Sequence, residues 1–351
     1  MKATVAKRIK AARTLAGLSM RELSDKLEGL VSYNAISKYE KAQMMPDSKV
    51  LLQLSKALNV KTDYFFRPFT VSIENIAFRK KRKLSVKEVN AIKENVTDAI
   101  SRYIELEGFL NLPINFVNPL AKIVIKNGAD IESAVTTLLE SWKLGINALP
   151  NVIELLEDKE IKVIEIDAKA EFDGFSGWAN NKIPVIVVNT NFSIERKRFT
   201  ALHELGHLVL SFDPELDEKT IEKLCHRFAG AMLMPQETFL NEFGSNRKRI
   251  SVGELIAIKE SYGISIQAIM ARAKDLGCIS EDRYISFRKW VNASDDRKKE
   301  IGLGGYQGKE HSTRFMQLLF RATSEELVSM SKAANLANVK LAQFRDDFVA
   351  I

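Results

Sequence analysis

Two of the four histidines in this 351-residue sequence, His203 and His207, are separated by three residues. On a helix, residues four positions apart lie on one face a single turn from each other, so both imidazole rings can bind the same zinc ion. Glu204 follows the first histidine, and a glutamate in this place takes a proton from the metal-bound water, whose pKa zinc lowers towards 7. The spacing therefore predicts a zinc peptidase centre with His203 and His207 as ligands and Glu204 as the catalytic residue.

A catalytic zinc site of this kind needs a third protein ligand. The extended motif that supplies a third histidine would place it at position 213, where this sequence has aspartate. The pattern of residues 220–233 predicts a second helix that carries Glu222, and a glutamate from a second helix completes a known two-histidine, one-glutamate site. We expect Glu222 to be the third ligand, and the alternatives are the acidic residues of the intervening loop: Asp213, Glu215 and Asp217.

Three further residues of metal-binding type have other expected roles. His226 lies four residues after Glu222, and we expect it to orient that ligand or to polarise the substrate from outside the ligand set. Cys225 is expected to be a small core residue rather than a redox switch, and His311, in a distant polar stretch, to be an ordinary surface histidine.

The elements around the two histidines indicate an α+β domain. Residues 161–166 alternate like a strand, residues 184–189 resemble a second strand, and residues 194–211 have the pattern of the helix that holds the histidines. The segment 172–178 is rich in turn residues. A small sheet packed on helices follows from this order of elements.

The apolar strand also suggests a substrate site. An exposed sheet edge at residues 183–189, beside the zinc helix, could add an extended peptide by main-chain pairing. We therefore expect Trp178 and Asn180 to line the substrate cleft.

The first 67 residues have the pattern of short helices separated by tight turns, which predicts an all-α domain. Ser19 and Glu22 form a capping box, Ser32 can cap a third helix, and Pro46-Asp47-Ser48 can open a fourth. Two helices of eight or nine residues around a glycine-containing turn are the helix-turn-helix pattern.

This N-terminal domain also carries the positive charge of the chain. Residues 1–67 contain 13 lysines and arginines against 6 acidic residues, and the net charge of the whole chain is +7, which is typical of a nucleic-acid-binding module joined to another domain. In a helix-turn-helix the recognition helix enters the major groove. A helical bundle that only mediates protein contacts is the alternative. The expected DNA contacts are Arg21, Ser32, Tyr33, Asn34, Ser37, Lys38 and Lys41.

The remaining segments complete the predicted organisation: a helix-turn-helix domain over residues 1–67, a helical connector over 68–145, the metallopeptidase domain over 146–285 and a helical region over 286–351. The basic run Arg79–Lys83 is expected to be a solvated linker, with phosphate binding as the alternative. Residues 251–277 have a second helix-turn-helix shape that serves equally as a packed hairpin. The glycines of residues 302–308 predict a flexible linker, and the helices of residues 312–348 a partner or dimer surface.

The bulk composition indicates a cytoplasmic protein without a membrane segment. No stretch reaches 18 consecutive apolar residues, and the basic start lacks the apolar core of a signal peptide. Two cysteines in so long a chain indicate a reducing compartment without a disulfide framework.

Two families are similar to this sequence. The order Gly17-Leu18-Ser19, Arg21-Glu22-Leu23, Ile36-Ser37-Lys38-Tyr39-Glu40 and Pro46 resembles the Xre family of lambda-repressor-like regulators, although a glycine shortly after the Tyr-Glu pair is absent. Residues of the second half resemble the ImmA/IrrE family of metallopeptidases: Asp173-Gly174-Phe175-Ser176, Val188-Asn189, Glu195-Arg196, Arg198-Phe199-Thr200, Ala201 to His207, Glu222-x-x-Cys225, Phe228-Ala229 and Leu233-Met234-Pro235.

The second resemblance implies a zincin-like domain with Zn²⁺ bound by His203, His207 and Glu222, and with Glu204 catalytic. It also implies cleavage of a partner protein, typically a DNA-bound repressor. One departure bears on the metal site: His226 stands where the family commonly has asparagine.

The pairing of the two domains favours a DNA-binding transcriptional regulator with a zinc-dependent endopeptidase domain that cleaves a regulatory protein of phage, mobile-element or stress type. The alternative is an antitoxin-like repressor whose peptidase-like domain binds a partner or senses a signal with little or no proteolysis. The expected partners are an operator in double-stranded DNA, a substrate, repressor or toxin encoded nearby, and a second copy of the chain.

Overall fold

The N-terminal domain is a bundle of short helices. The computed structural model of the protein describes residues 1–69, 71–74, 85–113 and 115–349, so the basic run Arg79–Lys83 lies outside the described residues. The side chains of Ser19, Ser32 and Asp47 cap their helices as the sequence predicts. Ile36 and Phe65 are fully buried in the core of this bundle. Its elements are α1 (Lys2–Leu15), α2 (Met20–Lys26), α3 (Tyr33–Glu40), α4 (Ser48–Leu58) and the 3-10 helix η1 (Thr62–Phe66).

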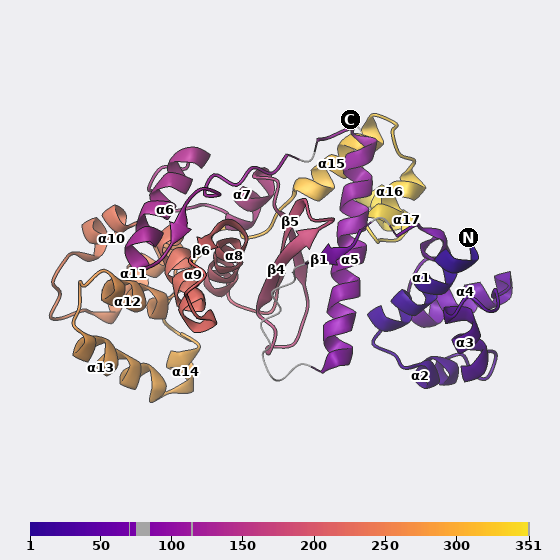
Figure 1. Ribbon diagram of the computed structural model, residues 1–351, viewed down its shortest axis with the longest axis horizontal. Coiled ribbons are helices and arrows are strands. Elements are labelled where there is room, and N and C mark those ends of the chain that lie inside the picture. Colours follow the sequence, from indigo (N-terminus) through magenta and orange to yellow (C-terminus); the bar gives the residue numbers. More distant parts are fainter. Residues whose placement is uncertain (70, 75–84, 114, 350–351) are drawn as a thin grey trace.

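A single long helix, α5 (Val86–Phe109), runs through the middle of the molecule, with the sheet on one side and the N-terminal domain on the other (Figure 1). The capping box of Ser85 and Glu88 opens it. Val96 and Ile100 pack against the sheet, and Leu106 belongs to a third apolar cluster formed with the C-terminal helices. Helix α5 therefore joins the three main parts of the chain.

The main sheet has the strand order β1-β4-β5-β3. Strand β4 pairs antiparallel with β1 and β5, and β3 pairs parallel with β5. The predicted exposed edge at residues 183–189 is wrong, because β5 lies between β4 and β3 and is buried along its length. The strands are β1 (Ile73–Glu74), β3 (Lys162–Ile166), β4 (Gly174–Ala179) and β5 (Ile183–Asn189).

The segment expected to be turns, residues 172–178, is largely strand β4. A Cβ atom at Gly174 would lie 2.5 Å from the carbonyl oxygen of Val187, so this glycine permits a close approach of the two backbones. Alternate residues of β4 and β5 face opposite layers: Phe175 and Val187 pack towards α5, whereas Val188 packs towards α8.

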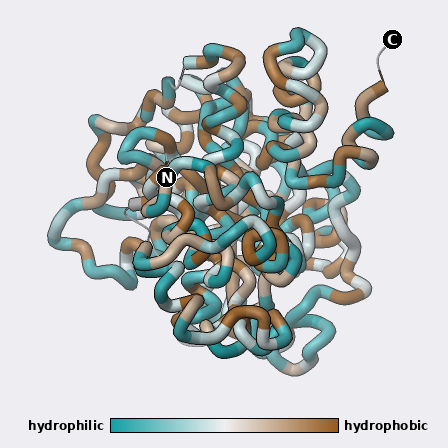
Figure 2. Tube along the Cα trace, turned by 90° about the vertical axis from the view of Figure 1, so that its right-hand side faces the viewer, coloured by the Kyte–Doolittle hydropathy of each residue, from teal (hydrophilic) through white to brown (hydrophobic). Residues whose placement is uncertain are grey.

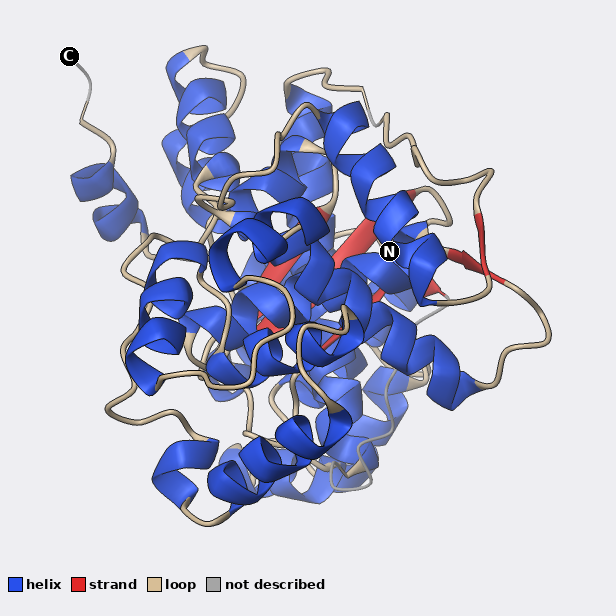
Figure 3. Cartoon of the chain, turned by 90° about the vertical axis from the view of Figure 1, so that its left-hand side faces the viewer, coloured by secondary structure: helices blue, strands red, loops and turns tan. Residues whose placement is uncertain are grey.

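Helices cover the other face of the sheet (Figure 3). Helix α8 packs on β4 and β5, α9 packs on α8, and α6 packs on α9. Strand β2 pairs with β6, and β1 with β4, so the expected connector of residues 68–145 is not a separate unit: its strands and α6 belong to the second domain. The elements are β2 (Val124–Ile125), α6 (Gly128–Trp142), α7 (Val152–Asp158), α8 (Ile194–Val209), β6 (Ser211–Phe212) and α9 (Glu218–Leu233).

The predicted second helix-turn-helix shape is a packed hairpin. Arg272, a basic residue of this hairpin, is buried and donates to the carboxylate of Glu132 and to the carbonyl oxygen of Met234. Arg247 is paired with Glu254. These contacts favour a packed helical hairpin over a second DNA-binding helix-turn-helix. The elements here are α10 (Gln236–Phe243), α11 (Val252–Tyr262), α12 (Ile266–Asp275), α13 (Glu281–Asn292) and α14 (Asp295–Lys298).

The glycine-containing segment after α14 is fastened to the domain, contrary to the expectation of a flexible linker. The backbone N–H of Tyr306 donates to Glu195, and Glu310 forms a buried ion pair with Arg198 at 2.6 Å. These contacts anchor the segment across the start of α8. His311, just beyond them, is exposed, as predicted for a surface histidine.

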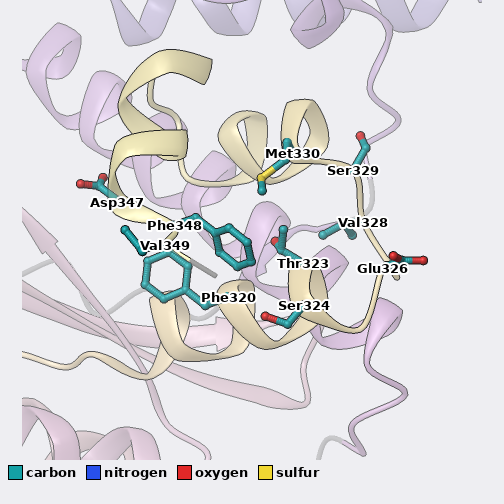
Figure 4. Close-up of a pocket in the computed structure, with 10 residues that line it drawn as sticks. All are labelled: Phe320, Thr323, Ser324, Glu326, Val328, Ser329, Met330, Asp347, Phe348 and Val349. Carbon is teal, nitrogen blue, oxygen red and sulfur yellow. The ribbon is translucent and has the colours of Figure 1, made fainter. Parts of the chain in front are cut away.

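Three helices end the chain: α15 (Arg314–Ser324), α16 (Met330–Leu336) and α17 (Leu341–Asp347). Lys61 of the N-terminal domain donates to carbonyl oxygens at the end of α16, 3.0 Å from Ala334 and 2.7 Å from Val339. A cavity of 790 Å³ lies between these helices, lined partly by Phe320 and Phe348, and contains none of the predicted site residues (Figure 4).

Hydrophobic and hydrophilic residues alternate along the helices (Figure 2), as expected for helices that bury one face and expose the other. In the part of the chain that is described, no helix combines the length and the apolar character needed to span a membrane.

Candidate metal centre

Helix α8 carries His203, Glu204 and His207. Ser193 caps its first turn, and the helix ends at Val209 because Leu210 is extended and leads into β6. Gly206 allows α9 to pack closely, since a Cβ atom there would lie 3.2 Å from the ring of Phe228, a tight contact. The tight packing of these two helices brings α9 residues within reach of the histidines.

The side chains of His203, His207 and Glu222 meet between α8 and α9. The two Nε2 atoms are 3.1 Å apart. The carboxylate oxygens of Glu222 lie 3.3 Å from Nε2 of His207 and 3.7 Å from Nε2 of His203. Among the described residues, these three form a group of the size and composition that can hold a metal ion, with all ligand atoms within 4.8 Å of one another.

The donor set fits a zinc ion. Two ligand atoms that each lie about 2.0–2.1 Å from a tetrahedral ion are about 3.4 Å apart, and the separations of 3.1, 3.3 and 3.7 Å bracket this value. Two imidazoles and one carboxylate also leave a fourth position open, as in catalytic rather than structural sites.

Two of the three alternative acidic ligands, Asp213 and Asp217, have local hydrogen-bond partners. Asp213 accepts a hydrogen bond from the backbone of Glu215 at 3.0 Å. Asp217 is the N-cap of α9, and hydrogen bonds from the hydroxyl and backbone of Thr220 lower the pKa of its carboxyl group. Neither aspartate belongs to the three-residue group around the histidines.

Glu204 is buried beside this group, with 2% of its surface exposed. The hydroxyl of Ser176, on strand β4, donates to Oε2 of Glu204 at 2.9 Å. Ser176 has no role predicted from its residue type or spacing, although it stands in the motif that resembles ImmA/IrrE peptidases. Alternation along β4 places Trp178 on the same face as Ser176, and Trp178 packs edge to face with Phe116 at 5.8 Å.

Asn180 lies in the turn that follows β4, with a positive φ of 51°. Its side-chain oxygen accepts a hydrogen bond from the backbone of Ser72, and its own backbone donates to the carbonyl oxygen of Ser72. These contacts attach β1 to the hairpin, and the expected position of Asn180 in a substrate cleft stays a prediction.

His226 lies against one of the candidate metal-binding histidines. Its ring centroid is 4.4 Å from that of His203 and 5.8 Å from that of Phe199, on which it stacks. The side chain is exposed. The ring of His226 thus packs against His203, and its expected effect on Glu222 or on the substrate stays a prediction.

The second candidate site is the outer surface of the N-terminal domain. Ser37 is half-buried, and Ser32 caps α3 through its hydroxyl. The guanidinium group of Arg21 lies over the ring of Tyr33, 6.0 Å from its centroid, which links α2 to the start of α3. Apart from Ser37, the residues predicted to contact DNA are exposed: Arg21, Ser32, Tyr33, Asn34, Lys38 and Lys41.

Comparisons with known families agree with this division of the chain. Residues 9–65 match the family described as helix-turn-helix, and residues 156–274 match the family described as IrrE N-terminal-like domain. Two characterised proteins are similar to parts of the chain. The HTH-type transcriptional regulator ImmR of Bacillus subtilis is 39% identical over 72 residues, which cover 20% of this chain and 55% of ImmR.

The radiation response metalloprotease IrrE of Deinococcus radiodurans is 33% identical over 94 residues, which cover 21% of this chain and 29% of IrrE. The chain thus spans about half the length of the first relative and less than a third of the second.

Proposed function

We propose that this chain, which joins a helix-turn-helix domain to a peptidase domain of the ImmA/IrrE type, is a DNA-binding regulator that cleaves a specific regulatory protein with the help of zinc. The observation that carries the proposal is the convergence of His203, His207 and Glu222 beside a buried Glu204. A structural zinc site would be closed by a fourth protein ligand, and Glu204 would then have no chemical role.

The residues of the site have separate roles in the proposed peptide hydrolysis. His203, His207 and Glu222 would hold the zinc ion, which, when bound, lowers the pKa of a water molecule and polarises a peptide carbonyl group. Glu204 accepts a proton from the attacking water, the water oxygen bonds to the carbonyl carbon, and the carbon–nitrogen bond breaks. Glu204 then returns the proton to the nitrogen of the leaving amine. Ser176 holds the carboxylate of Glu204 in place.

The DNA-binding half supports a regulatory rather than a digestive peptidase. The exposed residues of α3 form the surface that would enter the major groove, and we propose that the chain binds its operator as a homodimer, because paired half-sites are usual for this motif. A peptidase joined to a DNA-binding domain is kept close to proteins that act on the same operator. The proposed substrate is therefore a DNA-bound repressor or a protein encoded nearby.

The test compares the wild-type chain with Glu204→Gln. Each is loaded with zinc, incubated with proteins encoded next to its gene, and examined by mass spectrometry for cleaved products. Cleavage by the wild type alone supports the proposal. Binding without cleavage by both variants overturns it in favour of an antitoxin-like regulator whose peptidase domain only binds its partner.

The metal assignment has a separate test. Glu222→Ala should lose zinc, measured by metal analysis after dialysis, whereas Glu218→Ala should keep it. Glu218 is an exposed residue one turn earlier on the same helix, so it controls for the loss of a carboxylate from α9. Full retention of zinc by Glu222→Ala would show that the ligand is another residue.

A further inference from the structure

One turn of α9 contacts both candidate metal-binding histidines. Glu222 faces the Nε2 atoms of His203 and His207, and the ring of His226 lies against that of His203. Between them in the sequence, Cys225 approaches the other side of the second histidine, with its sulfur 3.6 Å from Nδ1 of His207. The imidazole of His207 therefore lies between the metal position and a thiol.

The two nitrogen atoms of a metal-bound imidazole are chemically linked. A histidine that binds a metal through Nε2 carries its remaining proton on Nδ1, and a partner for that N–H fixes both the tautomer and the orientation of the ring. The usual partners are carboxylates, backbone carbonyl groups and water. At His207 a thiol sulfur, which is a weaker acceptor, lies at hydrogen-bonding distance for sulfur.

The surroundings of Cys225 hold its sulfur in this position. The residue is fully buried on the inner face of α9. Gly206 of α8 lies against it, because a Cβ atom added there would be in contact with the sulfur at 3.4 Å and in tight contact with the ring of Phe228 at 3.2 Å. The thiol is thus packed between the two helices that carry the ligands.

We propose that Cys225 is a positioning residue for the metal ligand His207, accepting the Nδ1–H hydrogen bond that keeps Nε2 directed at the metal. The proposal rests on the metal centre of the proposed function. It goes beyond that function because it assigns part of the metal affinity to a residue that neither binds the ion nor contacts the substrate.

The test measures zinc affinity in the full-length chain by competition with a chromophoric chelator. Loss of a hydrogen-bond partner of a metal-binding histidine typically lowers metal affinity about 10- to 100-fold. Because sulfur is a weak acceptor, we expect Cys225→Ala to lower zinc affinity by the smaller factor, about 10-fold. Cys278→Ala is the matched control, because Cys278 is the other cysteine of the sequence and is also buried. It should leave zinc affinity unchanged.

A second measurement separates positioning of the ligand from general loosening of the core. In the Co²⁺-loaded chain, the visible ligand-field bands report the geometry of the ion, and they should shift in Cys225→Ala but not in Cys278→Ala. If Cys225→Ala does not fold, Cys225→Val fills the place of the sulfur with methyl groups that cannot accept a hydrogen bond. It should show the same loss of affinity.

The outcomes distinguish this inference from the proposed function. Zinc affinities within twofold of wild type in the Ala or Val variant, with unchanged Co²⁺ spectra, would overturn the role of Cys225 and leave the peptidase proposal intact. Equal losses in Cys225→Ala and Cys278→Ala would also overturn it, since packing alone would then explain them. A wild-type chain that binds no zinc would contradict the metal centre itself.

Discussion

The hydroxyl of Ser176 donates a hydrogen bond of 2.9 Å to the carboxylate of Glu204, and this bond joins strand β4 to α8, the helix that carries the candidate metal ligands His203 and His207. Both side chains are 2% exposed. A buried hydrogen bond to a carboxylate contributes about 1.5–3 kcal/mol, which is enough to select one orientation of the side chain. The sheet thereby determines where the proposed proton acceptor lies relative to the metal position.

Ser176→Ala should therefore reduce proteolysis without removing zinc. We expect the cleavage rate of the substrate found with the wild-type chain to fall about 10-fold, since about 1.4 kcal/mol of orientation corresponds to that factor. Zinc content should remain that of the wild type, because Ser176 is not in the ligand group. Unchanged cleavage by Ser176→Ala would mean that other contacts suffice to orient Glu204.

Local sequence patterns predicted those features that depend on neighbours within a few residues. The serine caps at Ser19 and Ser32 are confirmed, as is the helix that places His203 and His207 on one face. Each depends on contacts between residues three or four positions apart, which the sequence displays directly.

Features that depend on distant partners could not be predicted in this way. The prediction of an exposed edge at residues 183–189 is wrong because β4 and β3 flank β5. The glycines of β4 predict turns, because the close approach of two backbones that Gly174 permits is visible only in the folded sheet. Ser176 has no local signal of its role, since its partner is 28 residues away on another element.

The buried pair of Arg198 and Glu310 fastens the segment after α14 to α8, and its side chains are 0% and 1% exposed. Removal of one partner from such a pair leaves an uncompensated buried charge and costs about 3–5 kcal/mol. In urea denaturation, Glu310→Gln should thus lower the free energy of unfolding of the domain that contains α8 by about 3–5 kcal/mol. Glu325→Gln, in an exposed pair with Arg321, should cost less than about 1 kcal/mol. Equal effects of the two changes would argue against a fastened segment.

Because of the capping box of α2, the free energy of unfolding of the N-terminal domain should fall as the pH is lowered into the acid range. The backbone N–H of Ser19 donates to the carboxylate of Glu22, and this bond, with the Ser19 hydroxyl and Lys87, lowers the pKa of Glu22 to about 2. A carboxyl group whose pKa is lowered on folding stabilises the fold above its unfolded pKa of about 4.3, and this contribution disappears as the pH falls towards 2.

Glu22→Gln removes this titration. The difference in free energy of unfolding between wild type and Glu22→Gln should therefore be constant above pH 5 and shrink between about pH 4.3 and 2. Urea denaturation at a series of pH values measures it. A difference that is the same at pH 2.5 and pH 7 would exclude the proposed hydrogen bonds to the ionised carboxylate.

Lys38, exposed on α3, should contribute to operator binding through the DNA backbone. We expect Lys38→Ala to raise Kd about 5- to 10-fold and to reduce the slope of log K against log salt by about 1, because one fewer counterion is released when a phosphate contact is lost. Fluorescence anisotropy over a range of salt concentrations measures both quantities. Lys340→Ala removes the same charge from an exposed position in the C-terminal region and should change neither. If the two variants weakened binding equally, net charge rather than a contact by α3 would account for the effect, and the assignment of α3 as the DNA-contacting helix would fail.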